Sequence, residues 1–322
     1  MSFRGEQRGY PNPARRRESP PTPGRVGAIA ALIVVAVVVI VILIDSGPDS
    51  SSQPTTVSHT ASASHTSRQS QTSRSTAAPG AASVPILVYH VINTQPAGSS
   101  ANGALYVPSD QFSSQMQALK SAGWHAVTLN QLEAYWTRGT SLGSGKPIVI
   151  TFDNGYASQY TNALPILKGL GWVGVVDLQL TGLSPSDGGL TGDQIRSLIA
   201  AGWELDTQGV DHTDLTTLDP TQLSNELTVA RQMMQSTYGV TPNWLSYPSG
   251  DYNPTVTAAV RAAGYTGAMT VNQGWASPQQ DRFRLPRLVV TSGTTPAQLL
   301  TQIASAQTST SIPLAYSGVG LA

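Results

Sequence analysis

Residues 85–322 alternate short β-rich runs with amphipathic stretches, and this alternation restricts the possible fold more than any other feature of the sequence. The run ILVYHV at 86–91 is typical of a strand, whereas SDQFSSQMQALKSAG at 109–123 shows helical spacing and ends in glycine. Seven or eight strands, most followed by a helix, predict a parallel α/β architecture, specifically an irregular (β/α)7–8 barrel. The predicted strands are 86–91, 125–129, 147–152, 172–180, 203–207, 244–248, 266–271 and 287–291.

Three segments of different composition precede this domain. Residues 1–25 carry six arginines and several prolines without apolar periodicity, so we expect a basic, disordered cytoplasmic head. Residues 26–44 contain no charged side chain, and a helix of about 19 residues reaches roughly 28 Å, close to the thickness of a bilayer's hydrocarbon core. Residues 45–84 are rich in Ser, Thr and Pro, which predicts a disordered linker.

The apolar run 26–44 has two interpretations, a transmembrane helix and a cleaved signal peptide. A signal peptide has an apolar core of roughly 7–15 residues followed by small residues at its cleavage site, but Asp45 follows here. We therefore predict a single transmembrane helix in the cell membrane. Arginines before it, with Asp45 and Asp49 after it, predict a cytoplasmic amino terminus and an extracytoplasmic domain.

The composition of the domain excludes several kinds of function. The chain has no cysteine, which removes disulfides, thiolate nucleophiles and Cys-based zinc sites. Residues 84–322 hold ten basic and fourteen acidic side chains, a net charge of −4, which argues against a nucleic-acid partner. Any bound metal must therefore use oxygen and imidazole ligands.

Polar side chains stand where several predicted strands end. In a parallel barrel these ends meet on one face, where reactive groups gather. A carboxylate that ends a buried strand is costly unless it has a partner, so Asp153 is either functional or a helix cap. The predicted strand-end residues are His90, then Asp153 with Asn154, then Gln208 with His212 just beyond, and Tyr247 beside Pro248.

Four motifs in this order resemble the polysaccharide deacetylases, the fourth carbohydrate esterase family. The resemblance implies a deformed (β/α) barrel that holds one divalent metal, commonly zinc, on an Asp and two His. It also implies that a neighbouring Asp deprotonates water and a His protonates the departing amine. The motifs are PILVYHVI, ITFDNGY, WELDTQGVDHTDLT and LSYPSGDYN, and the similarity covers residues 85–292.

The resemblance implies a role for each matching residue. Asp153 takes the place of the general base. Tyr89-His90 is similar to the subgroup that acts on poly-N-acetylglucosamine, which implies that His90 is the acid. The metal positions fall on Asn154, Gln208 and His212, and the groove positions that contact substrate on Tyr156, Tyr247, Pro248 and Gly250.

Two of the three metal positions depart from the family's pattern. Asn154 stands where the family has Asp, and Gln208 stands where it has His, so a charge and a nitrogen ligand are lost. We expect zinc, if any metal, to bind weakly or not at all. Asp206 or Asp211 could supply a replacement carboxylate, although a role in turn formation is the alternative.

These observations leave two hypotheses about function. The first is a membrane-anchored hydrolase that removes N-acetyl groups from an amino sugar polymer of the cell wall or poly-N-acetylglucosamine type. Asp153, His90 and His212 favour it. The second is a pseudoenzyme that binds envelope glycan without cleaving it, which Asn154 and Gln208 favour.

Overall fold

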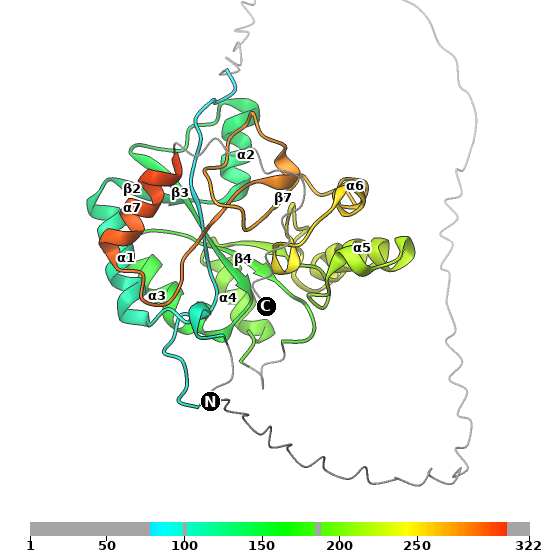
Figure 1. Ribbon diagram of the computed structural model, residues 1–322, viewed down its shortest axis with the longest axis horizontal. Helices are drawn as coiled ribbons and strands as arrows, with labels where there is room; N and C mark the ends of the chain where they lie inside the picture. Colours follow the sequence, from blue (N-terminus) through cyan, green and yellow to red (C-terminus); the bar gives the residue numbers. More distant parts are fainter. Residues whose placement is uncertain (1–77, 99–101, 184–187, 308–322) are drawn as a thin grey trace, which may run out of the picture. The chain divides into compact units, whose positions relative to one another are not determined.

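The computed structural model describes residues 78–98, 102–183 and 188–307 (Figure 1). The predicted cytoplasmic head, the predicted span 26–44 and the linker up to residue 77 lie outside the described residues. Within the described ranges, no helix combines the length and apolar character needed to cross a bilayer. The predicted anchor therefore stays a prediction.

The described residues form one sheet of eight strands, and all the strand pairs in it are parallel. The strand order is β7-β6-β5-β4-β3-β1-β8, and β2 also pairs with β3. This sheet agrees with the predicted α/β class. The strands are β1 (Ile86–Tyr89), β2 (Trp124–Val127), β3 (Lys146–Asn154), β4 (Val175–Leu178), β5 (Glu204–Thr207), β6 (Trp244–Ser246), β7 (Gly267–Met269) and β8 (Leu288–Val289).

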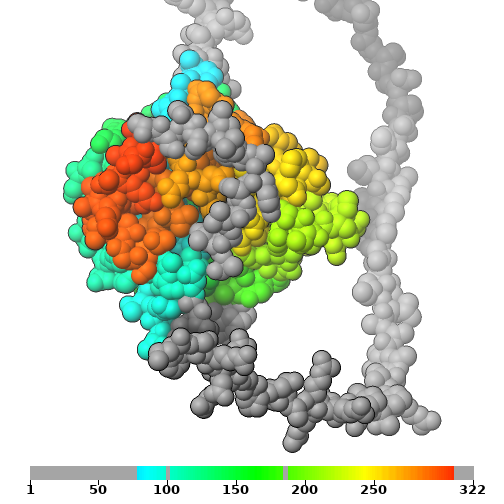
Figure 2. Space-filling view, in the orientation of Figure 1, coloured from blue at the N-terminus to red at the C-terminus, as the bar shows by residue number. Residues whose placement is uncertain are grey.

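Helices follow most strands, as the alternation predicts. Capping boxes begin α2, α4 and α5, in which Thr128, Thr191 and Asp219 each pair with a glutamine three residues later. Helix α7 packs against α1, and Figure 2 shows their surfaces as neighbours. The helices are α1 (Ser109–Ser121), α2 (Leu129–Arg138), α3 (Leu164–Gly169), α4 (Gly192–Ala200), α5 (Pro220–Tyr238), α6 (Pro254–Ala262) and α7 (Pro296–Gln307).

Two local features differ from the sequence-based expectation. The helix expected over 157–171 contains a wider π turn, Gln159–Ala163, before α3. The linker expected to end at residue 84 is already bonded to the domain at Gly80, whose N–H donates to the Tyr135 carbonyl over 2.8 Å. The folded domain therefore begins a few residues earlier than predicted.

The barrel has an irregular seam between β7 and β8, which do not pair with each other. Instead, Leu285 bridges Met269 of β7 in parallel, and the chain then runs into β8, which pairs with β1. The Leu285 N–H donates to the Ala268 carbonyl, and the Thr270 N–H donates to the Leu285 carbonyl. The structure is therefore a curved parallel sheet, consistent with the predicted irregular barrel, in which a bridging segment replaces one strand pair.

The core lies between the sheet and its helices. Four aromatic side chains pack against one another there: the rings of Phe152 and Trp203 are stacked with centroids 5.1 Å apart, and those of Tyr89 and Phe112 meet edge to face, also with centroids 5.1 Å apart. All four are buried. This packing connects β1 and β3 with α1 and with the residue just before β5.

Arg287 ties the strand ends together from inside the barrel. Its side chain is fully buried, and its guanidinium forms a bidentate pair with Asp153 at 2.7 and 2.9 Å. The same guanidinium donates to the hydroxyls of Thr151 and Ser246 and to the Thr270 carbonyl. One cation therefore links β3, β6, the end of β7 and the segment before β8.

Loss of this cation should destabilise the fold strongly. Arg287→Met leaves the buried Asp153 carboxylate without its charge partner, which typically costs about 3–5 kcal/mol. Urea unfolding of the purified chain measures the change. The matched control is Arg282→Met, because Arg282 is 43% exposed in its pair with Glu133 and such pairs contribute about 1 kcal/mol or less. Equal losses in the two variants would contradict the structural role of Arg287.

Candidate active site

One cavity at the carboxyl ends of the strands collects almost every residue that the sequence assigns to a site. Its volume is about 360 Å³. We call it the His90 pocket. Among the residues to which the family resemblance assigns a role, Pro248 alone does not line it. The lining residues are His90, Leu105, Asp153, Asn154, Tyr156, Gln179, Gln208, His212, Tyr247, Ser249, Gly250 and Val271.

At the predicted groove wall, Tyr247–Gly250, the Tyr247 hydroxyl is directed away from the pocket. Tyr247 is fully buried, and its hydroxyl donates to the Phe283 carbonyl over 2.9 Å. Pro248 is buried behind it and begins a short turn, in which Ser249 (φ 55°) and Gly250 (φ 82°) adopt left-handed backbone angles. This turn presents Ser249 and Gly250 to the pocket, whereas Tyr247 contributes only its ring.

Asp153 is held as a carboxylate by several donors. Besides the two bonds from Arg287, its Oδ2 accepts from the Gln208 amide over 3.0 Å and from the Ser246 hydroxyl over 3.2 Å. Burial alone would raise the pKa of Asp153, but the charge and hydrogen bonds of Arg287 outweigh it and lower the pKa. The group is therefore an anion with a weakened tendency to take up a proton.

The side-chain amides of Gln208 and Asn154 form hydrogen bonds with neighbouring residues of the pocket. Gln208 is 1% exposed, and while its Nε2 donates to Asp153, its Oε1 accepts from the Asn154 backbone N–H over 3.1 Å. The Asn154 side-chain amide donates to Gln179 Oε1 over 2.9 Å. Asn154 has φ 72°, a left-handed angle that asparagine tolerates better than most residues. Gln208 thus connects Asp153 to the turn that follows β3.

These contacts show that the residues present do not fit the family's metal site. The Gln208 oxygen, which would have to replace an imidazole nitrogen, already accepts a backbone hydrogen bond. The charge of Asp153 is already balanced by Arg287, so a divalent cation would find no net negative charge. Within the part of the chain that the structure describes, no three His, Cys, Asp or Glu side chains form a metal-binding group.

The two candidate replacement carboxylates serve other purposes. Asp206 is fully buried on β5, and its Oδ1 accepts from the backbone N–H groups of Asn243 and Trp244. Asp211 is exposed, and its Oδ1 accepts from the Thr213 N–H in a turn. The turn role considered for Asp211 is the one observed, and neither residue lines the His90 pocket.

The two histidines of the pocket are less basic than free imidazole. Burial lowers the pKa of His90, although the negative charge of Asp153 partly opposes this. Burial also lowers the pKa of His212, whose backbone has a left-handed φ of 65°. The His90 Nδ1 is buried, and no described residue is bonded to it. Both rings are therefore neutral at neutral pH, and each can still donate or accept a hydrogen bond.

A second buried carboxyl lies beside Asp153. Asp177 on β4 is the cross-strand neighbour of Asp153 on β3, and it is fully buried. Neither of its oxygens has a hydrogen-bond partner among the described residues, although Oδ2 lies 3.5 Å from Arg287 Nη1. Burial, with the charge of Asp153 second, raises the pKa of Asp177 well above its usual range. Asp177 therefore keeps its proton to a higher pH than an ordinary aspartate does.

Sequence reasoning missed several residues that hold the site. The role of Arg287 could have been predicted, because an arginine that begins an otherwise apolar strand needs a buried partner. Asp177 within the predicted strand 172–180 gave the same kind of signal. Gln159 gave none, yet its buried amide donates to the backbone carbonyls of His90 and Asp153 over 3.0 and 2.7 Å.

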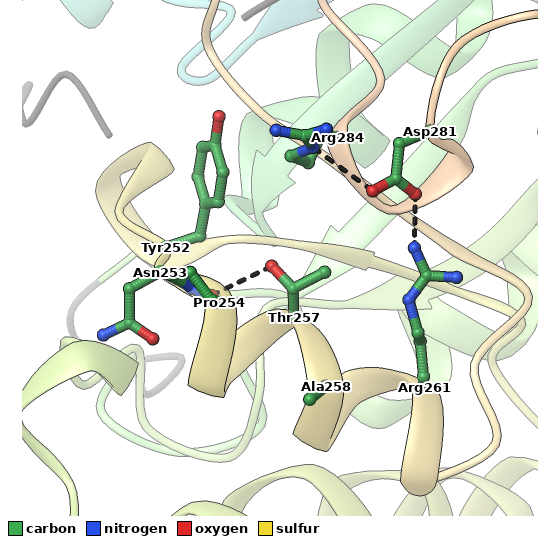
Figure 3. A pocket seen from close by; sticks show the side chains of 8 residues that line it. All are labelled: Tyr252, Asn253, Pro254, Thr257, Ala258, Arg261, Asp281 and Arg284. Carbon is green, nitrogen blue, oxygen red and sulfur yellow. Dashed lines mark hydrogen bonds and ion pairs between the residues drawn. The ribbon is translucent and has the colours of Figure 1, made fainter. Parts of the chain in front are cut away.

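A neighbouring cavity lies on the α6 side of the domain (Figure 3). Its charged groups pair with one another, since Asp281 binds both Arg261 and Arg284. Tyr252 joins it to the rest of the domain, because its ring stacks on that of Tyr247 with centroids 5.1 Å apart. This cavity and the His90 pocket share no lining residue.

The curved parallel sheet, with polar side chains gathered in one pocket at its strand ends, defines the domain as an irregular parallel (β/α) barrel. Residues 142–268 match the family model described as Polysaccharide deacetylase. The chain is 28% identical over 212 residues to YxkH of Bacillus subtilis (strain 168), which carries the same family description, and the match covers 66% of this chain and 73% of that one. The folded domain is therefore similar in sequence to the polysaccharide deacetylases.

Solved structures show the same architecture. The Streptococcus pyogenes deacetylase PplD, solved in complex with acetate, aligns with a TM-score of 0.64 and 26% identity over 69% of this chain and 99% of that one. IcaB from Ammonifex degensii aligns with a TM-score of 0.58 and 20% identity over 68% of this chain and 96% of that one. The second match shows the shared fold.

Removal of the Asp177 proton site should stabilise the fold at neutral pH. A raised pKa means that the folded state keeps a proton that the unfolded chain releases above about pH 4. Stability is therefore lost as the pH rises from about 4 toward the folded pKa, and Asp177→Asn avoids this loss. Urea unfolding should show a gain at pH 7 that disappears near pH 3. Asp193→Asn, at a side chain 96% exposed, should show no such pH dependence. A gain that is the same at both pH values would contradict the raised pKa of Asp177.

Restoring the family's ligands should create a metal site. Asn154→Asp with Gln208→His adds a charge and an imidazole, and should raise zinc affinity by more than about 100-fold, because changes beyond the direct ligands alone cost about 10- to 100-fold. Competition with a chelator measures the affinity of the purified chain. Asn93→Asp with Gln117→His, at two exposed positions, is the matched control. If the double variant binds zinc no better than the parent, the side chains of 154, 208 and 212 do not converge on one ion.

Proposed function

We propose that the chain is a membrane-anchored protein whose extracytoplasmic domain binds N-acetylated amino sugar polymer in the His90 pocket and hydrolyses its N-acetyl groups. The observation that carries this proposal is the meeting of His90, Asp153 and His212 in one cavity of a polysaccharide deacetylase domain. The apolar run 26–44 and the arginines before it support the anchor and its orientation.

The choice of polymer is supported by motif and by charge. Tyr89-His90 resembles the subgroup that acts on poly-N-acetylglucosamine, and His90 faces the pocket. Asp153, the one acidic residue that lines the pocket, is neutralised by Arg287, so a neutral acetylated sugar meets no net charge. Leu105 and Val271 supply apolar surface for a sugar ring or an acetyl methyl group.

The chain's own residues supply acid–base chemistry of limited strength. Asp153 is the anion of the pocket and takes the proton of an attacking water, although Arg287 makes it a weak base. His90 lies at the pocket wall and donates a proton to the departing amine nitrogen, after taking up that proton from Asp153 or from solvent. Because Asp153 is a weak base and the lowered pKa of His90 leaves little of its protonated, proton-donating form, we predict slow turnover.

A second candidate function is glycan binding without turnover. Gln208, which occupies a metal-ligand position of the family, favours this candidate. Its amide nitrogen donates to Asp153, and its amide oxygen accepts from the Asn154 N–H. This arrangement retains the shape of the pocket and lacks the usual means of polarising an acetyl group. The two candidates share the ligand and differ only in whether acetate is released.

Acetate release separates the two candidates. The purified chain is incubated with N-acetylglucosamine oligomers after chelation, and again with added zinc, cobalt or nickel. Hydrolysis predicts acetate that depends on His90, so that His90→Gln lowers the rate at least about 100-fold. Gln117→Ala, at an exposed position of α1 outside the pocket, is the control and should keep the parent rate. Oligomer binding without acetate under every condition supports the second candidate, and absence of binding contradicts both.

A further inference from the structure

The cavity on the α6 side of the domain has a chemistry of its own (Figure 3). Its volume is about 300 Å³, and all of its lining residues fall within 252–284, inside the described range 188–307. We call it the Arg284 cavity. Its apolar part is lined by Tyr252, Pro254 and Ala258, and its charged part by Arg261, Asp281 and Arg284.

The lining of the Arg284 cavity carries a net positive charge. Asp281 is its one acidic residue and is paired with two arginines, so one unit of positive charge is left over. The charged residues next to the lining in the chain do not cancel it. Arg282 is paired with Glu133, and Asp251 does not line the cavity. A ligand with a single negative charge would complete the balance.

The two guanidinium groups are held in place and still have free donors. Asp281 Oδ1 accepts from Arg261 Nη2, and Asp281 Oδ2 accepts from Arg284 Nε over 3.2 Å. Figure 3 shows the two side chains reaching this carboxylate from different elements. The Arg261 guanidinium also lies over the Phe283 ring, 3.9 Å from its centroid. Each guanidinium has five N–H groups, and the others have no acceptor among the described residues.

The uncharged polar groups of the lining are already engaged. Asn253 Oδ1 accepts from the Val256 N–H over 2.9 Å, and the Thr257 hydroxyl donates to the Asn253 carbonyl over 3.0 Å. The Tyr252 hydroxyl accepts from the Asn272 amide over 3.3 Å. Recognition of a ligand's charge therefore falls to the two arginines.

The apolar part of the cavity selects the body of the ligand. The Tyr252 ring is buried at one side, and Pro254 and Ala258 form an exposed rim on α6. The planar fork of a guanidinium matches both carboxylate and phosphate. A phosphate dianion would exceed the single positive charge and leave the apolar surface uncovered. A carboxylate joined to a small apolar group satisfies both parts, and the volume suits a ligand at the small end of the usual range.

We propose that the Arg284 cavity is a binding site for a small organic monoanion. The carboxylate of the ligand accepts from free N–H groups of Arg284 and Arg261, and its apolar body covers Tyr252 and Ala258. The proposal goes beyond the proposed function and does not rest on it, because the Arg284 cavity and the His90 pocket share no lining residue.

A pair of matched probes tests whether the cavity recognises a carboxylate. The full chain in detergent micelles is titrated with 4-fluorobenzoate and with 4-fluorobenzamide, which have similar shapes and differ in charge. Fluorine NMR measures both affinities, and micelles without protein give the background. We expect 4-fluorobenzoate to bind at least about tenfold more tightly, because hydrogen bonds to a charged group are stronger than those to a neutral one. Inorganic phosphate, added as a competitor, should displace it only weakly.

Two variants separate the charged part from the apolar part. Arg284→Met removes donors and should abolish most of the preference for 4-fluorobenzoate while leaving the affinity for 4-fluorobenzamide unchanged. Ala258→Phe, at an exposed position of α6, fills the rim and should weaken both probes. Arg282→Met is the matched control, because it removes the same charge from the same turn at a residue that does not line the cavity. Far-ultraviolet circular dichroism confirms that each variant is folded.

Each outcome decides the proposal. A preference for 4-fluorobenzoate that Arg284→Met removes and Arg282→Met keeps establishes the site. Equal binding of the two probes, absence of binding, or equal losses in the two arginine variants would overturn it. Displacement by phosphate at the same concentration as 4-fluorobenzoate would overturn the assignment to an organic monoanion. Acetate release from N-acetylglucosamine oligomers is a separate measurement, so failure of either proposal leaves the other standing.

Discussion

The buried pair between Arg287 and Asp153 is the interaction on which the site depends. An unpaired charge inside the barrel would cost several kcal/mol, so neither residue could occupy its place without the other. The two side chains meet in a bidentate geometry, and the remaining hydrogen bonds of Arg287 reach Thr151, Ser246 and Thr270. The carboxylate at the end of β3 is therefore placed by contacts with several strands at once. His90, Asn154 and Gln208 line the same pocket as that carboxylate, and Gln208 is bonded directly to it.

The two departures from the family's metal positions fit each other. With aspartate at 154 and histidine at 208, a cation would hold the two side chains together. With Asn154 and Gln208, the Gln208 amide makes this connection instead, because it donates to Asp153 and accepts from the Asn154 N–H. Aspartate at 154 would add a second negative charge beside Asp153, which Arg287 alone could not balance. The pair is therefore one consistent change from a cation-centred to a hydrogen-bonded site, rather than two independent losses.

The sequence predicted the strands and helices of the domain because their signals are local. Periodicity and capping residues mark each element, and the rule that parallel strands end on one face was enough to predict that His90, Asp153, Gln208 and His212 share a cavity. The hydrogen-bond and charge partners of these residues could not be predicted from the sequence. Arg287 meets Asp153 across 134 positions of sequence. The outward turn of the Tyr247 hydroxyl and the π turn at Gln159 depend on side-chain packing, which no periodicity records.

The seam of the barrel explains how Arg287 reaches the interior. Pro286 has no N–H, so the segment before β8 cannot form a regular ladder through that residue. The residues on either side donate toward β7 instead: the Leu285 N–H bonds to Ala268 and the Arg287 N–H to Asn272. These two bonds hold the segment beside β7, and the Arg287 side chain is buried and bonded to residues of β3 and β6. A closed ladder between β7 and β8 would occupy this edge with strand pairing. The irregularity of the barrel and the charge balance of its site therefore have the same structural origin.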